Sequence, residues 1–121
     1  MSRQNLVICF LGSGNMAEAI IKGLIATETV PASRIVVTDC LNARLEYLME
    51  TYGVKVRSRN AEAVRDSDVV FLTVKPHHVA GVLQEIAPTL GESDGPGDKG
   101  KKLLISIHFA AAGSLPLLYP S

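Results

Sequence analysis

The sequence predicts an α/β protein with a doubly wound parallel sheet, in which helices cover both faces of the sheet. Two observations predict this class. Short apolar segments alternate with segments of helical periodicity along most of the 121 residues, and a glycine-rich turn joins the first apolar segment to the first helix. Apolar residues make up 47% of the chain, enough for the core of one domain. We expect right-handed crossovers and a central first strand.

Every residue from 6 to 11 is apolar, as in a parallel strand that is covered on both faces. Gly12, Ser13 and Gly14 interrupt this strand, and Asn15 is expected to cap the helix that follows. Apolar side chains recur in that helix at helical spacing, at Met16, Ile20 and Leu24. The beginning of the chain therefore predicts a strand, a tight turn and an amphipathic helix.

A second strand is expected at residues 35–38, closed by Asp39. The helix that follows begins at about Asn42 and ends at Gly53, a typical C-terminal stop. Its apolar face is expected to contain Leu45, Leu48, Met49 and Tyr52. Residues 54–56 predict a weak third strand at an edge of the sheet.

The second half of the chain continues the alternation. Asn60 is expected to cap a short helix, and Pro76 to end the strand after it. Three elements are expected there, in order: a strand at 69–74, an amphipathic helix at 79–90 and a last strand at 103–107. Residues 91–102 are rich in Gly, Asp and Lys, which predicts a mobile surface loop.

Composition argues against several classes of function. Lysine plus arginine equals aspartate plus glutamate at 12 each, so the basic face needed for nucleic-acid binding is not expected. Cys9 and Cys40 predict a buried thiol and a free loop thiol in a reducing compartment. The three histidines are too scattered to predict a metal site. No apolar run approaches the ~20 residues of a membrane span. We expect a cytoplasmic protein with no membrane or nucleic-acid partner.

The pattern Gly12-x-Gly14-x-x-Ala17 is a form of the dinucleotide-binding fingerprint of Rossmann-type domains. Gly12 permits the tight turn out of the strand, and Gly14 lets a pyrophosphate approach the backbone. Ala17 keeps the helix close to the strand. The first N–H groups of the helix, around Asn15 and Met16, would then face the phosphates. An ordinary strand-to-helix turn is the alternative, but the flanking strand and helix favour the nucleotide site.

Two other positions support a dinucleotide site. Asp39 follows the second strand, a little beyond the usual ~20-residue separation from the glycines. A carboxylate there would accept hydrogen bonds from the adenosine ribose and repel a 2′-phosphate, which favours NADH, although a solvent-facing turn residue is the alternative. Residues 73–76 follow the fourth strand, beside the point where the strand order reverses, and should line the dinucleotide. The alternative for Lys75 is a solvated loop lysine.

These segments resemble pyrroline-5-carboxylate reductase. The resemblance covers about residues 5–107 and depends on four segments, namely 10–20 with the glycine pattern, Asn60, 67–77 with Val74-Lys75-Pro76, and 104–107. It is shared more loosely with the β-hydroxyacid and coenzyme F420-linked dehydrogenases. The family reduces 1-pyrroline-5-carboxylate to L-proline with NADPH or NADH, the last step of proline biosynthesis.

The resemblance implies cofactor contacts in four places: the glycine loop, the end of the second strand, a loop position and the end of the fourth strand. The residues concerned are Leu11, Gly12, Ser13, Gly14, Asn15, Met16, Asp39, Asn60, Thr73, Val74, Lys75 and Pro76. No Ser-His-Asp or paired-carboxylate arrangement is visible, so no catalytic residue is assigned, and the hydride chemistry would belong to the cofactor.

The family pattern ends after Ile107. We therefore expect a dinucleotide-binding domain at residues 1–107 and a divergent, irregular tail at 108–121. The family dimerises through a helical carboxyl-terminal domain, which is expected to be missing here, so this chain alone is not expected to be a competent reductase. Two alternatives are a non-catalytic NAD(P)-binding domain and a domain of a hydroxyacid-type dehydrogenase.

Overall fold

Five parallel strands form one sheet, in the order β3-β2-β1-β4-β5. The computed structural model describes residues 6–90 and 103–106. Its strands are β1 (Ile8–Leu11), β2 (Ile35–Thr38), β3 (Lys55–Arg57), β4 (Val69–Leu72) and β5 (Leu103–Ser106). The first strand is central, as predicted, because β2 and β4 both pair with β1. The strand order reverses between β2 and β4, which places a switch point beside β1.

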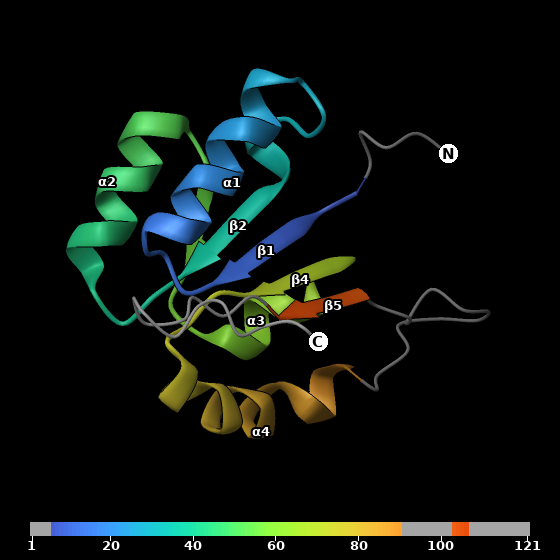
Figure 1. The fold of residues 1–121 in the computed structure, drawn as a ribbon. Coiled ribbons are helices and arrows are strands. Elements are labelled where there is room, and N and C mark those ends of the chain that lie inside the picture. Colours follow the sequence, from blue (N-terminus) through green and yellow to red (C-terminus); the bar gives the residue numbers. More distant parts are fainter. Residues whose placement is uncertain (1–5, 91–102, 107–121) are drawn as a thin grey trace, which may run out of the picture.

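Helices cover both faces of this sheet (Figure 1). In the described part of the chain they are α1 (Asn15–Ala26), α2 (Asn42–Tyr52), α3 (Asn60–Arg65) and α4 (Val79–Leu90), with 3₁₀ turns at η2 (Ala32–Arg34) and η3 (Pro76–His78). The helices α1 and α2 lie on one face, and α3 and α4 lie on the other. The doubly wound α/β fold that the sequence predicted is therefore confirmed.

The core consists of two apolar layers that share the central strand. Ile8 and Phe10 face α1 and α2, whereas Cys9 and Leu11 face α3 and α4. All four residues of β1 are buried, which explains why that strand has no polar position. The ring of Phe10 stacks on Phe71 of β4, with 4.8 Å between the ring centroids. Burial of β1 on both faces fixes the strand from which the glycine-rich turn departs.

Two predicted helix caps are wrong. Asn15 and Asn60 are the first helical residues of α1 and α3, and the N-caps are Gly14 and Arg59. Neither cap residue makes a side-chain cap hydrogen bond. The amide of Asn60 instead bonds to Thr38 and to α4, so tertiary hydrogen bonds use the side chain that was expected to cap locally.

The helix faces differ from prediction in detail. Ala17 and Ile21 are the buried residues of α1, while Met16 is only half-buried. In α2 the predicted Leu45 and Leu48 are buried, but Met49 is 42% exposed. One residue turns a helix by about 100°, so Met49 follows Leu48 out of the apolar stripe.

The remaining elements agree closely with the sequence. Gly53 ends α2 with φ 80°, the left-handed conformation that glycine favours. The strand β3 is at an edge, as predicted. The strand β4 ends at Leu72, two residues before the predicted end at 74, so Thr73 and Val74 begin the next loop, and Pro76 begins η3. The predicted loop at 91–102 and the predicted tail at 108–121 lie outside the described residues.

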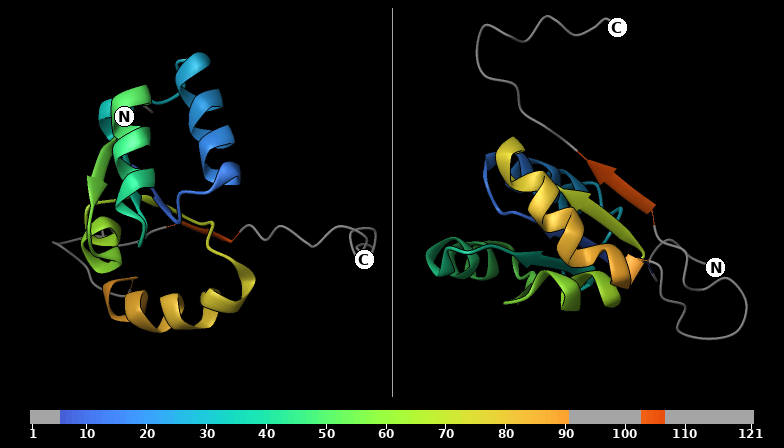
Figure 2. Two further views of the ribbon diagram at one scale, coloured as in Figure 1. Left: turned by 90° about the vertical axis from the view of Figure 1, so that its left-hand side faces the viewer. Right: turned by 90° about the horizontal axis from the view of Figure 1, so that it is seen from below.

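The parallel strands place all of their carboxyl ends at one edge of the sheet. The left panel of Figure 2 looks toward this edge, with α1 and α2 on one side and α3 and α4 on the other. Ligands of doubly wound proteins bind outside the carboxyl ends of the strands, at the switch point. The loops after β1, β2 and β4 are therefore the segments in which to look for a site.

Candidate dinucleotide-binding site

The loop after β1 is closed by a glycine that no other residue can replace without strain. Gly12 has φ 107°, and a Cβ atom there would lie 2.9 Å from both the carbonyl carbon of Thr73 and the nitrogen of Val74. Its N–H donates to the carbonyl oxygen of Thr38 at 2.9 Å. Gly12 thus lets the loop pass tightly between the ends of β2 and β4.

The second glycine of the pattern has a different environment. Gly14 is extended, with φ −75° and ψ −165°, and a Cβ atom there would meet nothing within 4 Å. The folded chain itself therefore does not require glycine at this position. Because α1 begins at the next residue without a side-chain cap, its first N–H groups are available at this opening. An open space at a helix N-terminus is what an anionic pyrophosphate group requires.

The loop is held in place by Asp39, at the end of β2. One carboxylate oxygen accepts hydrogen bonds from the N–H and the hydroxyl of Ser13, the former at 2.7 Å, and the other accepts from the N–H of Leu41 at 2.9 Å. Burial raises the pKa of Asp39, but these hydrogen bonds outweigh it and the net pKa lies below its ordinary value. Asp39 is therefore an ionised group that anchors the glycine loop.

A cation from α2 also contacts the loop. Nε and Nη2 of Arg44 donate to the carbonyl oxygen of Ser13 at 2.9 Å and 2.6 Å. Nη2 also lies 3.1 Å from Oε1 of Glu18, in the first turn of α1. The other oxygen of Glu18 accepts from the hydroxyls of Tyr47 and Tyr52, both at 2.7 Å. Glu18 thus connects the start of α1 to three side chains of α2.

On the face of the sheet that α3 and α4 cover, a row of polar side chains connects β2 to these two helices. The hydroxyl of Thr38 donates to Oδ1 of Asn60, and Nδ2 of Asn60 donates to Oε1 of Glu85 at 3.0 Å. Thr38 is buried, whereas Asn60 is half-buried and Glu85 is exposed. The row therefore runs from the end of the sheet out to the surface of α4.

The end of β4 forms the remaining wall. The N–H of Thr73 donates to the carbonyl oxygen of Leu11 at 3.0 Å. The hydroxyl of Thr73 donates to the carbonyl oxygen of Gly12 at 2.8 Å. These bonds tie the Thr73 backbone to the glycine loop and direct the chain toward Lys75, which is exposed.

These walls enclose a crevice of about 740 Å³. Nine of the residues predicted to contact a cofactor line it: Gly12, Ser13, Gly14, Asn15, Asp39, Asn60, Thr73, Val74 and Lys75. Leu11, Met16 and Pro76 are not among its lining residues, and Leu11 is fully buried.

The sequence did not single out several other lining residues, including Leu41, Arg59, His78 and Glu85. Nothing in their local sequence distinguishes them, because each reaches the crevice only through the tertiary fold. Three basic residues, Arg44, Arg59 and Lys75, line the crevice together with the acidic Asp39 and Glu85. The excess of basic over acidic residues suits a ligand that carries negative charge.

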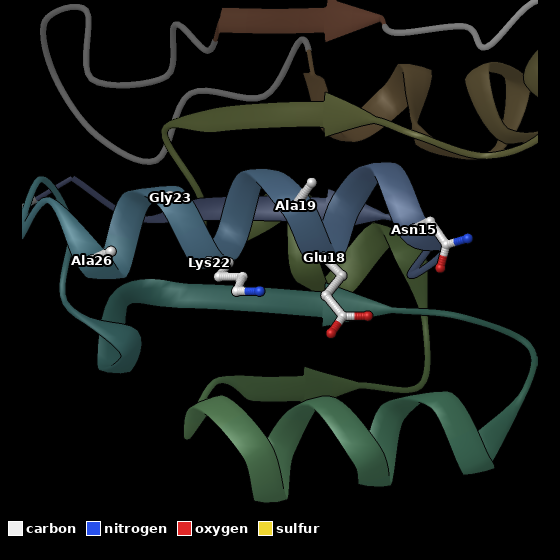
Figure 3. Close-up of a pocket in the computed structure, with 6 residues that line it drawn as sticks. All are labelled: Asn15, Glu18, Ala19, Lys22, Gly23 and Ala26. Carbon is white, nitrogen blue, oxygen red and sulfur yellow. The ribbon is translucent and has the colours of Figure 1, made fainter.

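A second hollow, of about 460 Å³, lies along the outer surface of α1 (Figure 3). Its described lining comes from this helix alone: Asn15, Glu18, Ala19, Lys22, Gly23 and Ala26. Of these, Asn15 also lines the crevice. A surface formed by one helix cannot surround a dinucleotide, so the crevice is the candidate site.

Residues 6–90 and 103–106 contain neither a metal centre nor a membrane-spanning helix. No group of three His, Cys, Asp or Glu side chains is placed to hold a metal ion there. None of the helices in those ranges has the length and apolar character required to cross a bilayer. Cys9 is buried and Cys40 exposed, which confirms the prediction for both thiols.

The strand order and the glycine-closed crevice define a Rossmann-type domain. Residues 7–108 match the family described as NADP oxidoreductase, coenzyme F420-dependent, and the chain belongs to this family. The predicted resemblance to the amino-terminal NAD(P)-binding domain of pyrroline-5-carboxylate reductases is also confirmed by individual relatives.

One such relative is a pyrroline-5-carboxylate reductase from Glycine max, which is 35% identical over 92% of this chain and 36% of its own length. A solved pyrroline-5-carboxylate reductase from Coxiella burnetii is 35% identical, with a TM-score of 0.74 over 85% of this chain and 35% of its own. The Plasmodium falciparum pyrroline carboxylate reductase with NADP bound is 25% identical, with a TM-score of 0.69 over 87% of this chain and 34% of its own. This chain therefore spans about a third of the length of these relatives.

Proposed function

We propose that this chain supplies the NAD(P)H-binding domain for reduction of 1-pyrroline-5-carboxylate to L-proline. The observation that carries the proposal is the opening at Gly14, where a Cβ atom would meet nothing within 4 Å at the N-terminus of α1. The relatives that share this part of the chain are named pyrroline-5-carboxylate reductases, and they supply the substrate of the proposal.

The residues of the crevice fit a nicotinamide dinucleotide. The N–H groups at the start of α1 would bind the pyrophosphate, and Lys75 adds positive charge to the crevice. Asp39 and Arg44 lie beside the loop after β2, where the adenosine ribose of a Rossmann domain is held. Thr73 and Val74 lie at the end of β4, beside the position of the nicotinamide.

The cofactor, when bound, would supply a hydride for the carbon of the substrate's C=N bond. That carbon is more electrophilic when the imine nitrogen is protonated. The part of the chain that the structure describes binds and orients the cofactor. We assign none of its side chains to proton transfer. The proposal also includes the family's small-molecule substrate and a cytoplasmic location.

Cofactor binding through the glycine loop is tested with Gly14→Val. The fold should tolerate this change, because φ at Gly14 is ordinary and the space beside it is open. The valine side chain would occupy the space meant for the pyrophosphate, so we expect binding of NADPH and NADH to weaken by at least about tenfold, that is ~1.4 kcal/mol. Calorimetric titration with each cofactor measures the effect.

Gly23→Val is the matched control. Gly23 lies within α1, the helix that begins after Gly14, a Cβ atom there would also meet nothing within 4 Å, and the residue does not line the crevice. We expect this variant to bind like the parent chain. Equal cofactor affinity in the parent and a folded Gly14→Val variant would show that the site is placed wrongly.

A further inference from the structure

We infer that Glu85 is a positioning residue that fixes the orientation of the Asn60 side chain in the crevice. This inference rests on the proposed function, since it concerns how the crevice presents hydrogen-bond donors to a dinucleotide. Asn60 was predicted to contact the cofactor, and nothing in the sequence pointed to Glu85. The two residues are on different helices, α3 and α4, and both line the crevice.

The orientation of a side-chain amide depends on what its neighbours can donate and accept. The hydroxyl of Thr38 can do either, so alone it would bond to Asn60 in both orientations of the amide. An ionised carboxylate can only accept. With Glu85 as neighbour, Nδ2 of Asn60 must point toward α4, and Oδ1 must then accept from Thr38. This is the arrangement observed, with 3.0 Å between Nδ2 and Oε1 of Glu85.

The fixed amide has one N–H that these bonds do not use. Nδ2 carries two hydrogens, and one of them is donated to Oε1 of Glu85. Asn60 is only half-buried and lines the crevice, so the second N–H is available to a ligand there. Reversing the amide would replace this donor with an acceptor. Glu85 therefore determines which polar group Asn60 offers to a bound cofactor.

The same row of hydrogen bonds is connected to the glycine loop. The carbonyl oxygen of Thr38 accepts from the N–H of Gly12, while its hydroxyl donates to Asn60. A change at Glu85 thus reaches Asn60 directly and the turn after β1 only through the backbone of Thr38. We expect any weakening of cofactor binding by a Glu85 substitution to depend on Asn60.

The test is Glu85→Gln, with NADPH and NADH titrated separately by calorimetry. Glutamine keeps the size of the side chain, but its amide can donate as well as accept, so it does not impose one orientation on Asn60. Removing a negative charge from the crevice would by itself strengthen binding of an anionic cofactor. The positioning role predicts the opposite sign, namely binding that is about fivefold weaker.

Two controls separate positioning from charge. Glu50→Gln removes an exposed charge on α2 that does not line the crevice, and should leave binding unchanged. In an Asn60→Ala background, Glu85→Gln should cause no further weakening, because the group that Glu85 orients is gone. Unchanged or tighter binding by Glu85→Gln, or an equal loss in both backgrounds, would overturn the inference.

A second measurement requires no cofactor. In ¹⁵N-labelled chain, the two side-chain amide protons of Asn60 should have well-separated shifts, and Glu85→Gln should move them while Glu50→Gln should not. Unchanged Asn60 signals in Glu85→Gln would contradict the positioning role even if the parent chain bound no dinucleotide. Absence of binding by the parent chain, with the expected NMR changes, would instead contradict the proposed function alone.

Discussion

Gly12 and Gly14 belong to one sequence pattern but are glycines for different reasons. At Gly12 the backbone has φ 107° and the end of β4 leaves no room for a side chain, so the folded chain requires glycine. At Gly14 the backbone is ordinary and the surrounding space is open. The fold alone therefore explains the first glycine, whereas the second would be explained by the proposed contact with a pyrophosphate. Ala17, the third position, is fully buried against the core below α1.

Asp39 determines the charge beside the expected adenosine ribose. Its carboxylate already holds Ser13 and Leu41, and its pKa is lowered, so it remains ionised near neutral pH. A negative charge there opposes a 2′-phosphate, whereas the nearby Arg44 guanidinium is bonded to Ser13 and Glu18. We therefore expect NADH to bind more tightly than NADPH.

We predict that Asp39→Asn shifts the cofactor preference toward NADPH by roughly tenfold, because it removes the repulsion and keeps an oxygen that accepts from Leu41. The ratio of the two dissociation constants measures the shift independently of any general weakening of the loop. The variant also loses an ionic acceptor for Ser13, so its affinity for both cofactors is expected to fall somewhat. A parent chain that prefers NADPH, with the ratio unchanged in Asp39→Asn, would contradict the assignment.

At the residue scale, the sequence could identify only those positions whose role is local. The glycine loop was predictable because a strand, a turn and a helix follow one another directly. Asn60, which was predicted to contact the cofactor, lines the crevice. Its prediction as a helix cap was wrong, because its partners Thr38 and Glu85 are 22 and 25 residues away. Glu85 itself could not be predicted, since only the packing of α3 against α4 brings it to Asn60.

The helices α1 and α2 are joined by a polar cluster as well as by apolar packing. Hydrogen bonds from the hydroxyls of Tyr47 and Tyr52, together with Arg44, lower the pKa of Glu18 to about 2. The same bonds raise the pKa of Tyr47 and raise that of Tyr52 to about 12. Since Arg44 also bonds to Ser13, this cluster supports the glycine loop from the side of α2.

The pKa shift of Glu18 predicts a pH-dependent part of the stability. Because the folded pKa is lowered from 4.5 to about 2, the stabilisation is fully present above the unfolded pKa and is lost as pH falls toward 2. We expect Glu18→Gln to lower the thermal midpoint near neutral pH, with a difference from the parent that shrinks between pH 5 and pH 2. Thermal unfolding followed by circular dichroism at several pH values measures this.

The same cluster gives an upper limit to the pH window. The pKa values of both tyrosines are raised, so their contribution is present below the ordinary tyrosine pKa and is lost at higher pH, for Tyr52 as pH rises toward 12. The control for the acid-dependent effect of Glu18→Gln is Glu46→Gln, which removes an exposed acidic group from α2. Its difference from the parent is not expected to shrink between pH 5 and pH 2. A Glu18→Gln difference that stays constant from pH 7 to pH 2 would contradict the ionic role of this carboxylate.

At the element scale, strands were easier to predict than the exact faces of helices. The strand β1 has apolar residues throughout because both of its faces are buried, and a short apolar run that ends at a glycine turn is typical of such a strand. In α2, by contrast, Leu48 and Met49 are equally apolar in sequence, and only the direction in which the helix packs decides that the first is buried and the second exposed. The starts of α1 and α3 were wrong by one residue, since an asparagine can cap or begin a helix.

On the scale of the whole molecule, the crevice is formed by loops from three strands and is supported on both sides of the sheet. The loops after β1, β2 and β4 are tied together by backbone bonds from Gly12 to Thr38 and from Thr73 to Leu11. A site held in this way by the sheet itself needs little rearrangement to receive a dinucleotide. Cofactor binding is therefore a property that we expect the described residues to possess on their own.

Catalytic turnover requires more of the structure than cofactor binding does. Hydride transfer requires the nicotinamide and the imine to be held together in near-attack geometry, and loss of that arrangement forfeits much of the rate. None of the described residues that line the crevice is assigned a role in binding the imine, and the relatives named as reductases are about three times as long as the part that matches. The imine site of the proposed reaction is thus expected to need groups beyond these.

We therefore predict that the 121-residue chain by itself binds NAD(P)H but shows little or no reduction of 1-pyrroline-5-carboxylate. The measurement is a steady-state assay of cofactor oxidation with purified chain, in parallel with calorimetry on the same sample, and Gly14→Val as a control for contaminating host reductase. Residual turnover that persists in Gly14→Val would come from the contaminant. Turnover by the parent chain at a rate typical of enzymes, ~10 s⁻¹, that is abolished in Gly14→Val would show that the substrate site also lies within this chain.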